Sequence, residues 1–96
     1  YQVRFSAAAR KDLARLTAFI AERDIGVARR ARTAINDALK LLEKFPFSCR
    51  TAGDDDPFLR EMIVSFGHAG FAVLYKIGTG EVTIIAVRHQ SEQDYY

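Results

Sequence analysis

The chain of 96 residues is long enough for one small domain, and its 49% hydrophobic and 27% charged residues are ordinary for a globular protein. No apolar run approaches the roughly 18 residues of a membrane span, and the single cysteine, Cys49, excludes an internal disulfide and suits a reducing cytoplasm. One cysteine and two separated histidines do not form a zinc-binding pattern, so we expect one domain over residues 1–96 with no metal and no cofactor.

The net charge of +2 conceals an asymmetry along the chain. Residues 1–50 carry eleven Lys and Arg against five Asp and Glu, a net +6, whereas residues 51–96 carry three against seven, a net −4. A basic surface attracts an acidic partner, either a protein or a nucleic acid. We therefore expect the first half of the chain to contribute a surface for such a partner.

A short strand and an amphipathic helix are predicted first. Residues 1–5 alternate with a period of two, and Ser6 is a favourable N-cap for the segment that follows. Over residues 7–23 the apolar residues recur at spacings of four, three and four, on one face of a helix. These residues are Ala9, Leu13, Leu16 and Ile20.

A second amphipathic helix follows a break at residues 24–26. Its apolar face is predicted to consist of Ala31, Ile35, Ala38, Leu42 and Phe45. Pro46 ends this helix, since proline disfavours the helical conformation of the residue before it. Because the break is short, the two helices are expected to form an antiparallel hairpin.

The second half of the chain changes to strand periodicity. Residues 47–57 are predicted to be a loop, and we interpret its acidic run, residues 54–56, as solvated rather than metal-binding. Residues 58–65, 71–77 and 82–88 are rich in β-branched and aromatic residues, and glycine-containing turns join them. The order strand–helix–helix–strand–strand–strand predicts an α+β fold, with the helical hairpin on one face of a mostly antiparallel sheet.

These strands are apolar on both alternating sets of positions. In the last strand we expect Val82, Ile84 and Ala86 on one side of the sheet, and Ile85 and Val87 on the other. One face takes the helices, and the other is too apolar to remain in water without cover. Two alternatives are open, because either a partner or the C-terminal tail could cover it.

The chain ends on VRHQSEQDYY, in which Arg88 and His89 follow an apolar strand. With FPFSCR after the second helix, PFLREM at the next strand and GFAVLY in the middle strand, this ending resembles the ParE/RelE superfamily of bacterial toxins. The resemblance extends over nearly the whole chain. It implies the toxin of a type II toxin–antitoxin module, whose cognate antitoxin folds on binding around the hairpin and the sheet.

Within this superfamily, the RelE branch cleaves mRNA on the ribosome and the ParE branch inhibits DNA gyrase. A ribonuclease needs positive charge on the sheet to stabilise an anionic phosphorane. RelE-like toxins place an Arg after the Gly-aromatic pair of the middle strand and lysines in the strand before it, whereas this sequence has Ala72, Glu61 and Met62 there. The resemblance therefore implies a ParE-like inhibitor of DNA gyrase with no chemistry of its own.

The alternative is a RelE-like, ribosome-dependent mRNA endonuclease. Its candidate catalytic residues would be Arg60, Arg88, His89, Tyr95 and Tyr96. Each has a structural interpretation as well: Arg60 as a snorkelling side chain paired with a local carboxylate, His89 as a polar strand end, and the tyrosines as a solvated terminus. A third alternative is a degenerate member that only binds antitoxin.

For a binding protein, the residues predicted to contact antitoxin or target are Arg29, Arg30, Arg32, Arg60, Arg88 and His89. The first three lie in the first turns of the second helix, where the helix dipole disfavours each cation by a few tenths of a kcal/mol. Such an unfavourable cluster indicates binding, although solvated arginines are an equally good interpretation.

Overall fold

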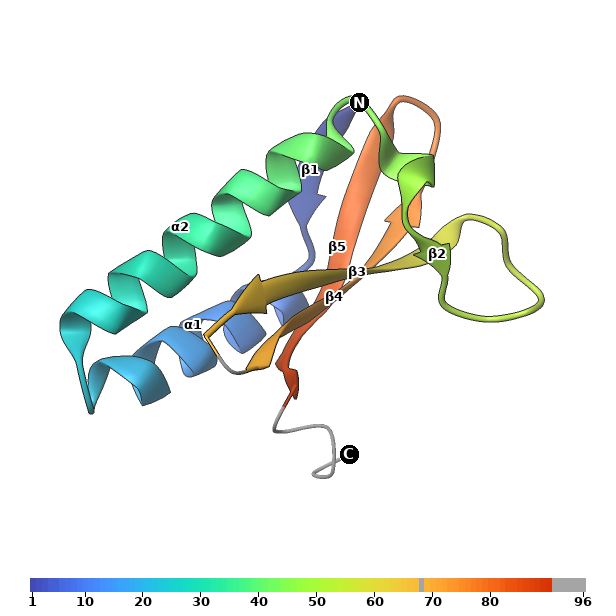
Figure 1. The fold of residues 1–96 in the computed structure, drawn as a ribbon. Coiled ribbons are helices and arrows are strands. Elements are labelled where there is room, and N and C mark those ends of the chain that lie inside the picture. Colours follow the sequence, from blue (N-terminus) through green and yellow to red (C-terminus); the bar gives the residue numbers. More distant parts are fainter. Residues whose placement is uncertain (68, 91–96) are drawn as a thin grey trace.

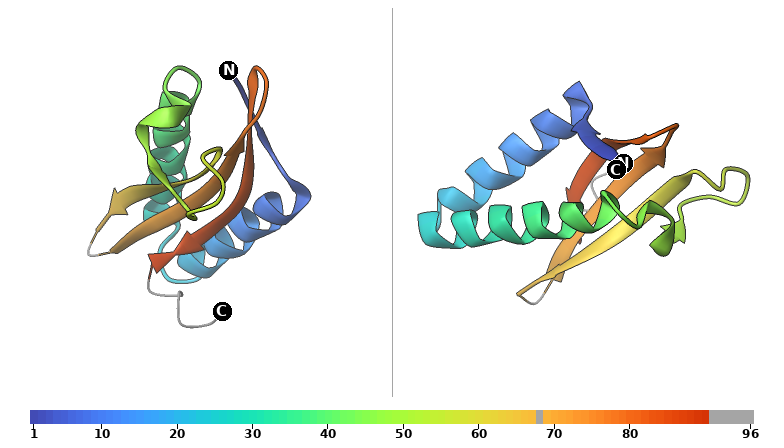
Figure 2. Two further views of the ribbon diagram at one scale, coloured as in Figure 1. Left: turned by 90° about the vertical axis from the view of Figure 1, so that its right-hand side faces the viewer. Right: turned by 90° about the horizontal axis from the view of Figure 1, so that it is seen from above.

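The computed structural model describes residues 1–67 and 69–90, and its elements follow the predicted order (Figure 1). The elements are β1 (Gln2–Phe5), α1 (Ala7–Ala21), α2 (Ile25–Leu42), the 3-10 turn η1 (Pro46–Ser48), β2 (Arg50–Thr51), β3 (Leu59–Phe66), β4 (Ala69–Ile77) and β5 (Glu81–His89). The strands form one sheet in the order β1-β5-β4-β3-β2, in which β1 runs parallel to β5 and the other neighbours are antiparallel. Both helices cover the same face of the sheet (Figure 2), which confirms the predicted α+β fold.

The two helices begin at residues that supply side-chain caps. The Ser6 hydroxyl accepts a hydrogen bond from the Ala9 N–H at 3.0 Å. The Asp24 carboxylate accepts hydrogen bonds from the N–H groups of Gly26 and Val27, at 2.8 and 3.2 Å. These contacts satisfy first-turn N–H groups that have no partner within a helix, so the hairpin connection at residues 22–24 is fixed locally.

Helix α2 ends at Leu42, three residues before the predicted end. Phe45 is not helical, with φ −131° and ψ 57°, and its side chain is 58% exposed. The cause is Pro46, whose ring clashes with a helical conformation of the preceding residue. Pro46 begins η1 instead, where its missing N–H would have had no helical partner anyway.

The predicted loop at residues 47–57 contains a strand that the sequence did not reveal. Strand β2 pairs antiparallel with β3, placing Arg50 opposite Glu61 and Thr51 opposite Arg60. Two residues are too few to show a period, so only their pairing with β3 defines the strand. From Met62 onward, the outer edge of β3 has no strand partner within the described residues.

The hydrophobic core lies between the helices and the sheet. Helical core residues include Leu13, Leu16, Ile35, Leu39 and Leu42, and sheet core residues include Met62, Val64, Phe71, Val73, Tyr75, Val82, Ile84 and Val87. Each of them is at most 6% exposed. Neither described helix is long and apolar enough to span a membrane.

A β-bulge in β5 changes the predicted alternation of that strand. Leu74 of β4 pairs with Ala86 and the adjacent Tyr75 with Ile84, so Ile85 has no partner in register. Val87 is therefore fully buried on the helix side, and Ala86 lies on the opposite face. The strict alternation expected from the sequence is wrong at these two residues.

Helix α1 supplies the polar contacts that the bulge requires. The Asp12 carboxylate accepts a hydrogen bond from the Val87 N–H at 3.0 Å, and the Ser6 hydroxyl donates to the Ile85 carbonyl at 3.2 Å. A bulge interrupts the hydrogen bonds between strands, and a buried N–H without an acceptor is destabilising. The position of α1 on the sheet and the shape of β5 are thus coupled through Asp12 and Ser6.

Candidate interaction surface

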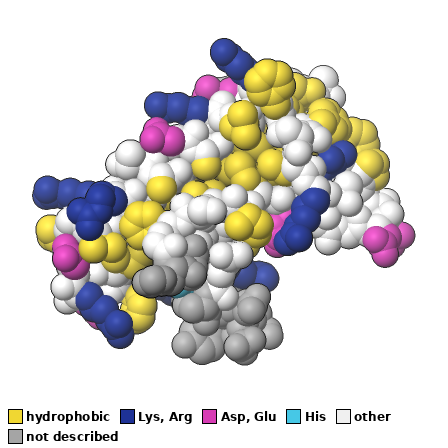
Figure 3. Space-filling model, in the orientation of Figure 1, with side chains coloured by type: hydrophobic (Ala, Val, Ile, Leu, Met, Phe, Trp, Pro, Cys, Tyr) yellow, Lys and Arg dark blue, Asp and Glu magenta, His cyan; other side chains and the backbone are white. Residues whose placement is uncertain are grey.

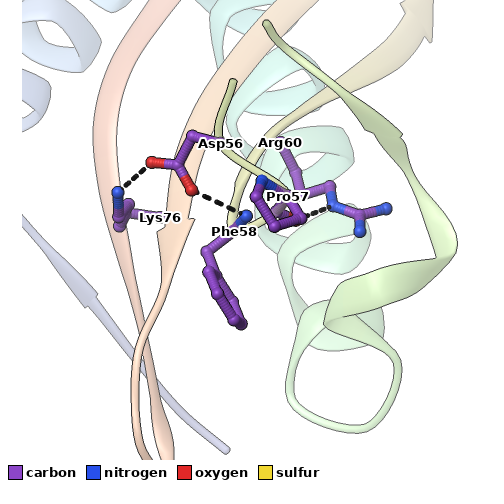
Figure 4. Close-up of polar contacts among 5 residues, drawn as sticks. All are labelled: Asp56, Pro57, Phe58, Arg60 and Lys76. Carbon is purple, nitrogen blue, oxygen red and sulfur yellow. Dashed lines mark hydrogen bonds and ion pairs between the residues drawn. The ribbon is translucent and has the colours of Figure 1, made fainter. Parts of the chain in front are cut away.

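Arg60 lies near the start of β3 on the face that the helices cover, opposite the buried Tyr75 of β4. Its guanidinium donates to three backbone carbonyls: Nε to Pro57 at 2.7 Å, and Nη1 to Cys49 at 2.7 Å and to Phe47 at 3.2 Å. The Pro57 contact is drawn in Figure 4. The prediction that Arg60 pairs with a carboxylate is wrong, because carbonyls of the segments before and after β2 accept its hydrogen bonds instead.

Tyr75, in the core, holds the segment between α2 and β2. Its hydroxyl donates to the Pro46 carbonyl at 2.6 Å. Burial, followed by a hydrogen bond with the Cys49 side chain, raises the pKa of Tyr75 above its ordinary value, so the phenol stays protonated and remains a donor. Sequence reasoning treated Tyr75 only as an apolar strand residue, since nothing local indicates a hydrogen bond to a residue 29 positions earlier.

Asp56 has a structural role within the acidic run. Its carboxylate accepts a hydrogen bond from the Phe58 N–H at 2.9 Å and forms an ion pair with Lys76 of β4 (Figure 4). The hydrogen bond from Lys76, followed by that from the Phe58 N–H, lowers the pKa of Asp56 below its ordinary value. The acidic run was predicted to be only solvated, but Asp56 makes both of these contacts within the fold. Within the described part of the chain, no three His, Cys, Asp or Glu side chains are grouped so that they could hold a metal ion.

Hydrophobic side chains are exposed beyond the C-terminal end of α2. Phe45, Phe47 and Phe58 are each about half exposed, and the rings of Phe47 and Phe58 meet edge to face with centroids 6.1 Å apart. A groove of about 480 Å³, which we call the α2–β3 groove, adjoins this aromatic cluster. It is lined by Ala38, Leu41, Ser48, Cys49, Arg50, Glu61, Met62 and Ile63. Hydrophobic side chains gather here between α2 and the sheet (Figure 3).

Arg88 and His89 lie on opposite faces of the sheet, because consecutive residues of a strand alternate between its faces. Arg88 is exposed and pairs with Ala72 on the face without helices. His89 pairs with Phe71 on the helix side, where the two rings meet edge to face with centroids 5.4 Å apart. At the end of β5, however, both residues border one hollow of about 220 Å³, together with Ala72 and Gln90.

Arg60 is separated from this pair. Its register partner on β4 is Tyr75, whereas those of Arg88 and His89 are Ala72 and Phe71, near the other end of that strand. The structure therefore does not bring the three described candidates for RNA cleavage into one site. Tyr95 and Tyr96, the remaining candidates, lie outside the described residues.

The face without helices carries apolar residues between ion pairs. Leu74 and Ala86 are partly buried opposite one another, and Ile63 is 43% exposed. Ion pairs join Arg50 to Glu61, Lys76 to Asp56, and Arg4 to Glu81. Most of the positive charge on this face is thus matched by a carboxylate. Cover of this face by a partner or by the tail stays a prediction.

The three arginines predicted to bind a partner are exposed on α2, and their contact with a partner stays a prediction. Arg32 lines a hollow of about 300 Å³ together with Arg10 of α1 and Asn36 of α2. Arg29 and Arg30 are not among the residues that line it. Sequence reasoning missed Arg10 and Asn36, because the two helices come together at this point only in the folded chain.

The helical hairpin on a five-stranded sheet is also the fold of solved bacterial structures. One comes from the chromosomal ParDE TA system of P. aeruginosa, with a TM-score of 0.69 and 15% identity over 92% of this chain and 94% of that chain. Another is the conserved hypothetical protein HP0894 from Helicobacter pylori, with a TM-score of 0.52 and 15% identity over 94% of each chain. These likenesses show the fold alone, and it is the α+β arrangement that the order of elements predicted.

The sequence itself makes the assignment to a family. The family model for the ParE toxin of type II toxin-antitoxin system, parDE, matches residues 3–94, and the chain belongs to this family. The chain is also 29% identical over 93 residues to the Toxin RelE1 of Caulobacter vibrioides, covering 97% of both proteins. Membership of a type II toxin–antitoxin family implies an antitoxin partner.

Proposed function

We propose that this toxin acts in the cytoplasm by binding DNA gyrase and holding the gyrase–DNA cleavage complex in a poisoned state. The observation that carries the proposal is the position of Arg60. Its guanidinium is bound to three carbonyls on the helix side of the sheet, away from Arg88 on the opposite face. A toxin that binds its target does not require these residues to converge.

The charge on the sheet supports the same proposal. Cleavage of RNA at a 2′-hydroxyl spreads negative charge over phosphate oxygens, and the enzyme must present unmatched cations to it. Arg50 and Lys76 are each ion-paired with a carboxylate, and Glu61 and Ala72 occupy the positions where RelE-like enzymes carry cations. The described face thus offers a phosphorane little positive charge.

We assign the α2–β3 groove to the antitoxin. Exposed apolar side chains such as Leu41 and Ile63 line it, and the edge of β3 beside it has no strand partner among residues 1–67 and 69–90. A segment that folds on binding can insert apolar side chains into such a groove and hydrogen-bond to such an edge. The antitoxin would thereby cover the apolar surface that the free toxin leaves in water.

Two assays with the purified toxin test the proposed target. In one, the toxin is added to ribosomes on a defined mRNA; in the other, to gyrase with supercoiled DNA. We expect intact mRNA, together with a gyrase-dependent rise in cleaved DNA or a loss of supercoiling. Arg88→Ala should weaken the effect on gyrase in a graded way, by ~1–3 kcal/mol if its charge is paired at the interface.

The RelE-like ribonuclease is the second candidate, and the likeness to Toxin RelE1 over nearly the whole chain favours it. In that case His89 and the pair Tyr95 and Tyr96 would transfer protons beside Arg88. Removal of a general acid or base lowers a rate by ~10²–10⁴, so His89→Ala alone would then abolish cleavage. Site-specific cuts in ribosome-bound mRNA that disappear in His89→Ala would replace the gyrase proposal with this one. Activity in neither assay would point to a member that only binds antitoxin.

A further inference from the structure

A hollow lies where the helical hairpin meets the first strand. The two helices diverge from their connection, and β1 runs between their far ends (Figure 1). The ends of β1 are tied to both helices: the Tyr1 ammonium donates to the Glu43 carbonyl after α2 at 2.8 Å, and Ser6 caps α1. Within this frame, residues of all three elements or of their ends line the hollow of about 300 Å³.

The lining combines an apolar floor with basic and amide walls. Leu13 is 5% exposed and Phe5 is partly buried, and with Ala14 they form the apolar part. Arg10, Arg32 and Asn36 form the polar part, and all three are exposed. Among the described residues, no Asp or Glu lines this hollow.

Most cations of the sheet have a counter-charge, whereas Arg10 and Arg32 of the helices have none among the described residues. Arg4, Arg50 and Lys76 are each ion-paired with a carboxylate. Within residues 1–67 and 69–90, neither the Arg10 nor the Arg32 guanidinium makes a hydrogen bond or an ion pair. Two cations from different helices thus share one hollow without an anion between them.

The chemistry of the lining selects one kind of ligand. A guanidinium binds a carboxylate through two parallel hydrogen bonds, and a second guanidinium with an amide N–H can satisfy the remaining lone pairs. The apolar floor favours the methylene groups of an acidic side chain and an apolar neighbour over a row of nucleic-acid phosphates. The family supplies a protein partner in the form of the antitoxin.

We infer that Arg10, Arg32 and Asn36 form a site for one Asp or Glu side chain of the antitoxin, which is seated between α1 and α2. The inference rests on the antitoxin partner of the proposed function and not on gyrase as the target. It replaces the predicted set Arg29, Arg30 and Arg32 with residues of both helices. An acid in this site would bridge the two helices where the hairpin meets β1, apart from the α2–β3 groove.

The test measures binding of the full-length cognate antitoxin to toxin variants by surface plasmon resonance at two salt concentrations. Arg10→Gln and Arg32→Gln should each raise the Kd by ~10-fold, mostly through faster dissociation, because a charged hydrogen-bonded contact is lost. The matched control is Lys11→Gln, which removes an exposed cation adjacent to Arg10 that does not line the hollow. It should change the Kd by less than about threefold, as expected for a rim charge.

A charge exchange identifies the carboxylate. Arg32→Glu should abolish tight binding, and an antitoxin in which the matching acid is replaced by Arg should restore it. A Kd for Arg10→Gln and Arg32→Gln within threefold of the wild type, or an equal loss in Lys11→Gln, would overturn the inference. So would variants that lose binding to a 30-base-pair DNA duplex while binding antitoxin normally. Gyrase assays without antitoxin report separately on the target, so failure there leaves these measurements interpretable.

Discussion

Two side chains of the sheet hold the irregular segments before and after β2. Arg60 donates to the carbonyls of Phe47, Cys49 and Pro57, and Tyr75 donates to that of Pro46. These carbonyls belong to irregular backbone that cannot satisfy itself through a helix or a strand ladder. The sequence predicted Arg60 as a contact for antitoxin or target, whereas in the structure its guanidinium holds irregular backbone in place.

Arg60→Lys should therefore destabilise the protein. A lysine keeps the charge but cannot present the planar fork that reaches three carbonyls, and we expect a loss of ~1–3 kcal/mol in the free energy of unfolding. Urea denaturation measures the loss. Arg50→Gln is the control, because it removes an exposed ion pair that contributes ~0–1 kcal/mol. Unchanged stability in Arg60→Lys, with loss of antitoxin binding, would make Arg60 a partner contact instead.

Strand β5 and helix α1 define one another's positions. The bulge at Ile85 turns the Val87 side chain into the core, and Asp12 of α1 supplies the acceptor for the Val87 N–H. The same bulge leaves Arg88 and His89 on the faces where they are found. Which of these two candidate residues faces the helices thus depends on the bulge, where a helix and a strand 75 residues apart are in contact.

Asp12→Ala removes that acceptor and should lower the free energy of unfolding by ~1–3 kcal/mol, because a partly buried N–H is left unsatisfied. Asp12→Asn retains a side-chain oxygen and should lose less. Asp37→Ala is the matched control, since its exposed pair with Lys40 contributes only ~0.2–0.5 kcal/mol. Hydrogen exchange at the Val87 amide should accelerate in Asp12→Ala alone. Equal exchange in all three variants would show that Asp12 does not stabilise the bulge.

The molecule as a whole presents a basic helical side and an apolar groove. Arg10, Arg29, Arg30 and Arg32 are exposed on the helices and make no ion pair with a described residue, whereas the carboxylates of the sheet are paired with its cations. The α2–β3 groove and the aromatic cluster of Phe45, Phe47 and Phe58 lie at one end of α2. A partner with acidic and apolar residues would complement both surfaces.

Ile63→Glu in this groove should weaken antitoxin binding by ~30-fold or more, as expected for an apolar anchor worth at least ~2 kcal/mol. Ile63 is 43% exposed, so the free energy of unfolding should change little. Phe19→Glu is the control, because Phe19 is 54% exposed but does not line this groove. Isothermal titration with the antitoxin gives both affinities. Similar losses for the two variants would argue against the groove as the docking site.

The helices and long strands could be predicted because their signals are local. Ser6 caps α1 through the next three residues, and Pro46 acts on the residue before it. The α2 boundary was wrong by three residues because the apolar spacing continued to Phe45 after the helix had ended. The bulge at Ile85 could not be predicted, because its neighbours Ile84, Ala86 and Val87 are all apolar and show no change of pattern.

The sequence alone determined the order of elements, the side of each helix that is buried and the family, because periodicity and motif order are properties of neighbouring residues. Only the tertiary structure decided which side chains meet. It placed Arg60 on three carbonyls, turned His89 rather than Arg88 toward the helices, and brought Arg10 beside Arg32. These outcomes depend on strand register and on the packing of helices over the sheet. Both are fixed by burying the core as a whole, and no short stretch of residues encodes them.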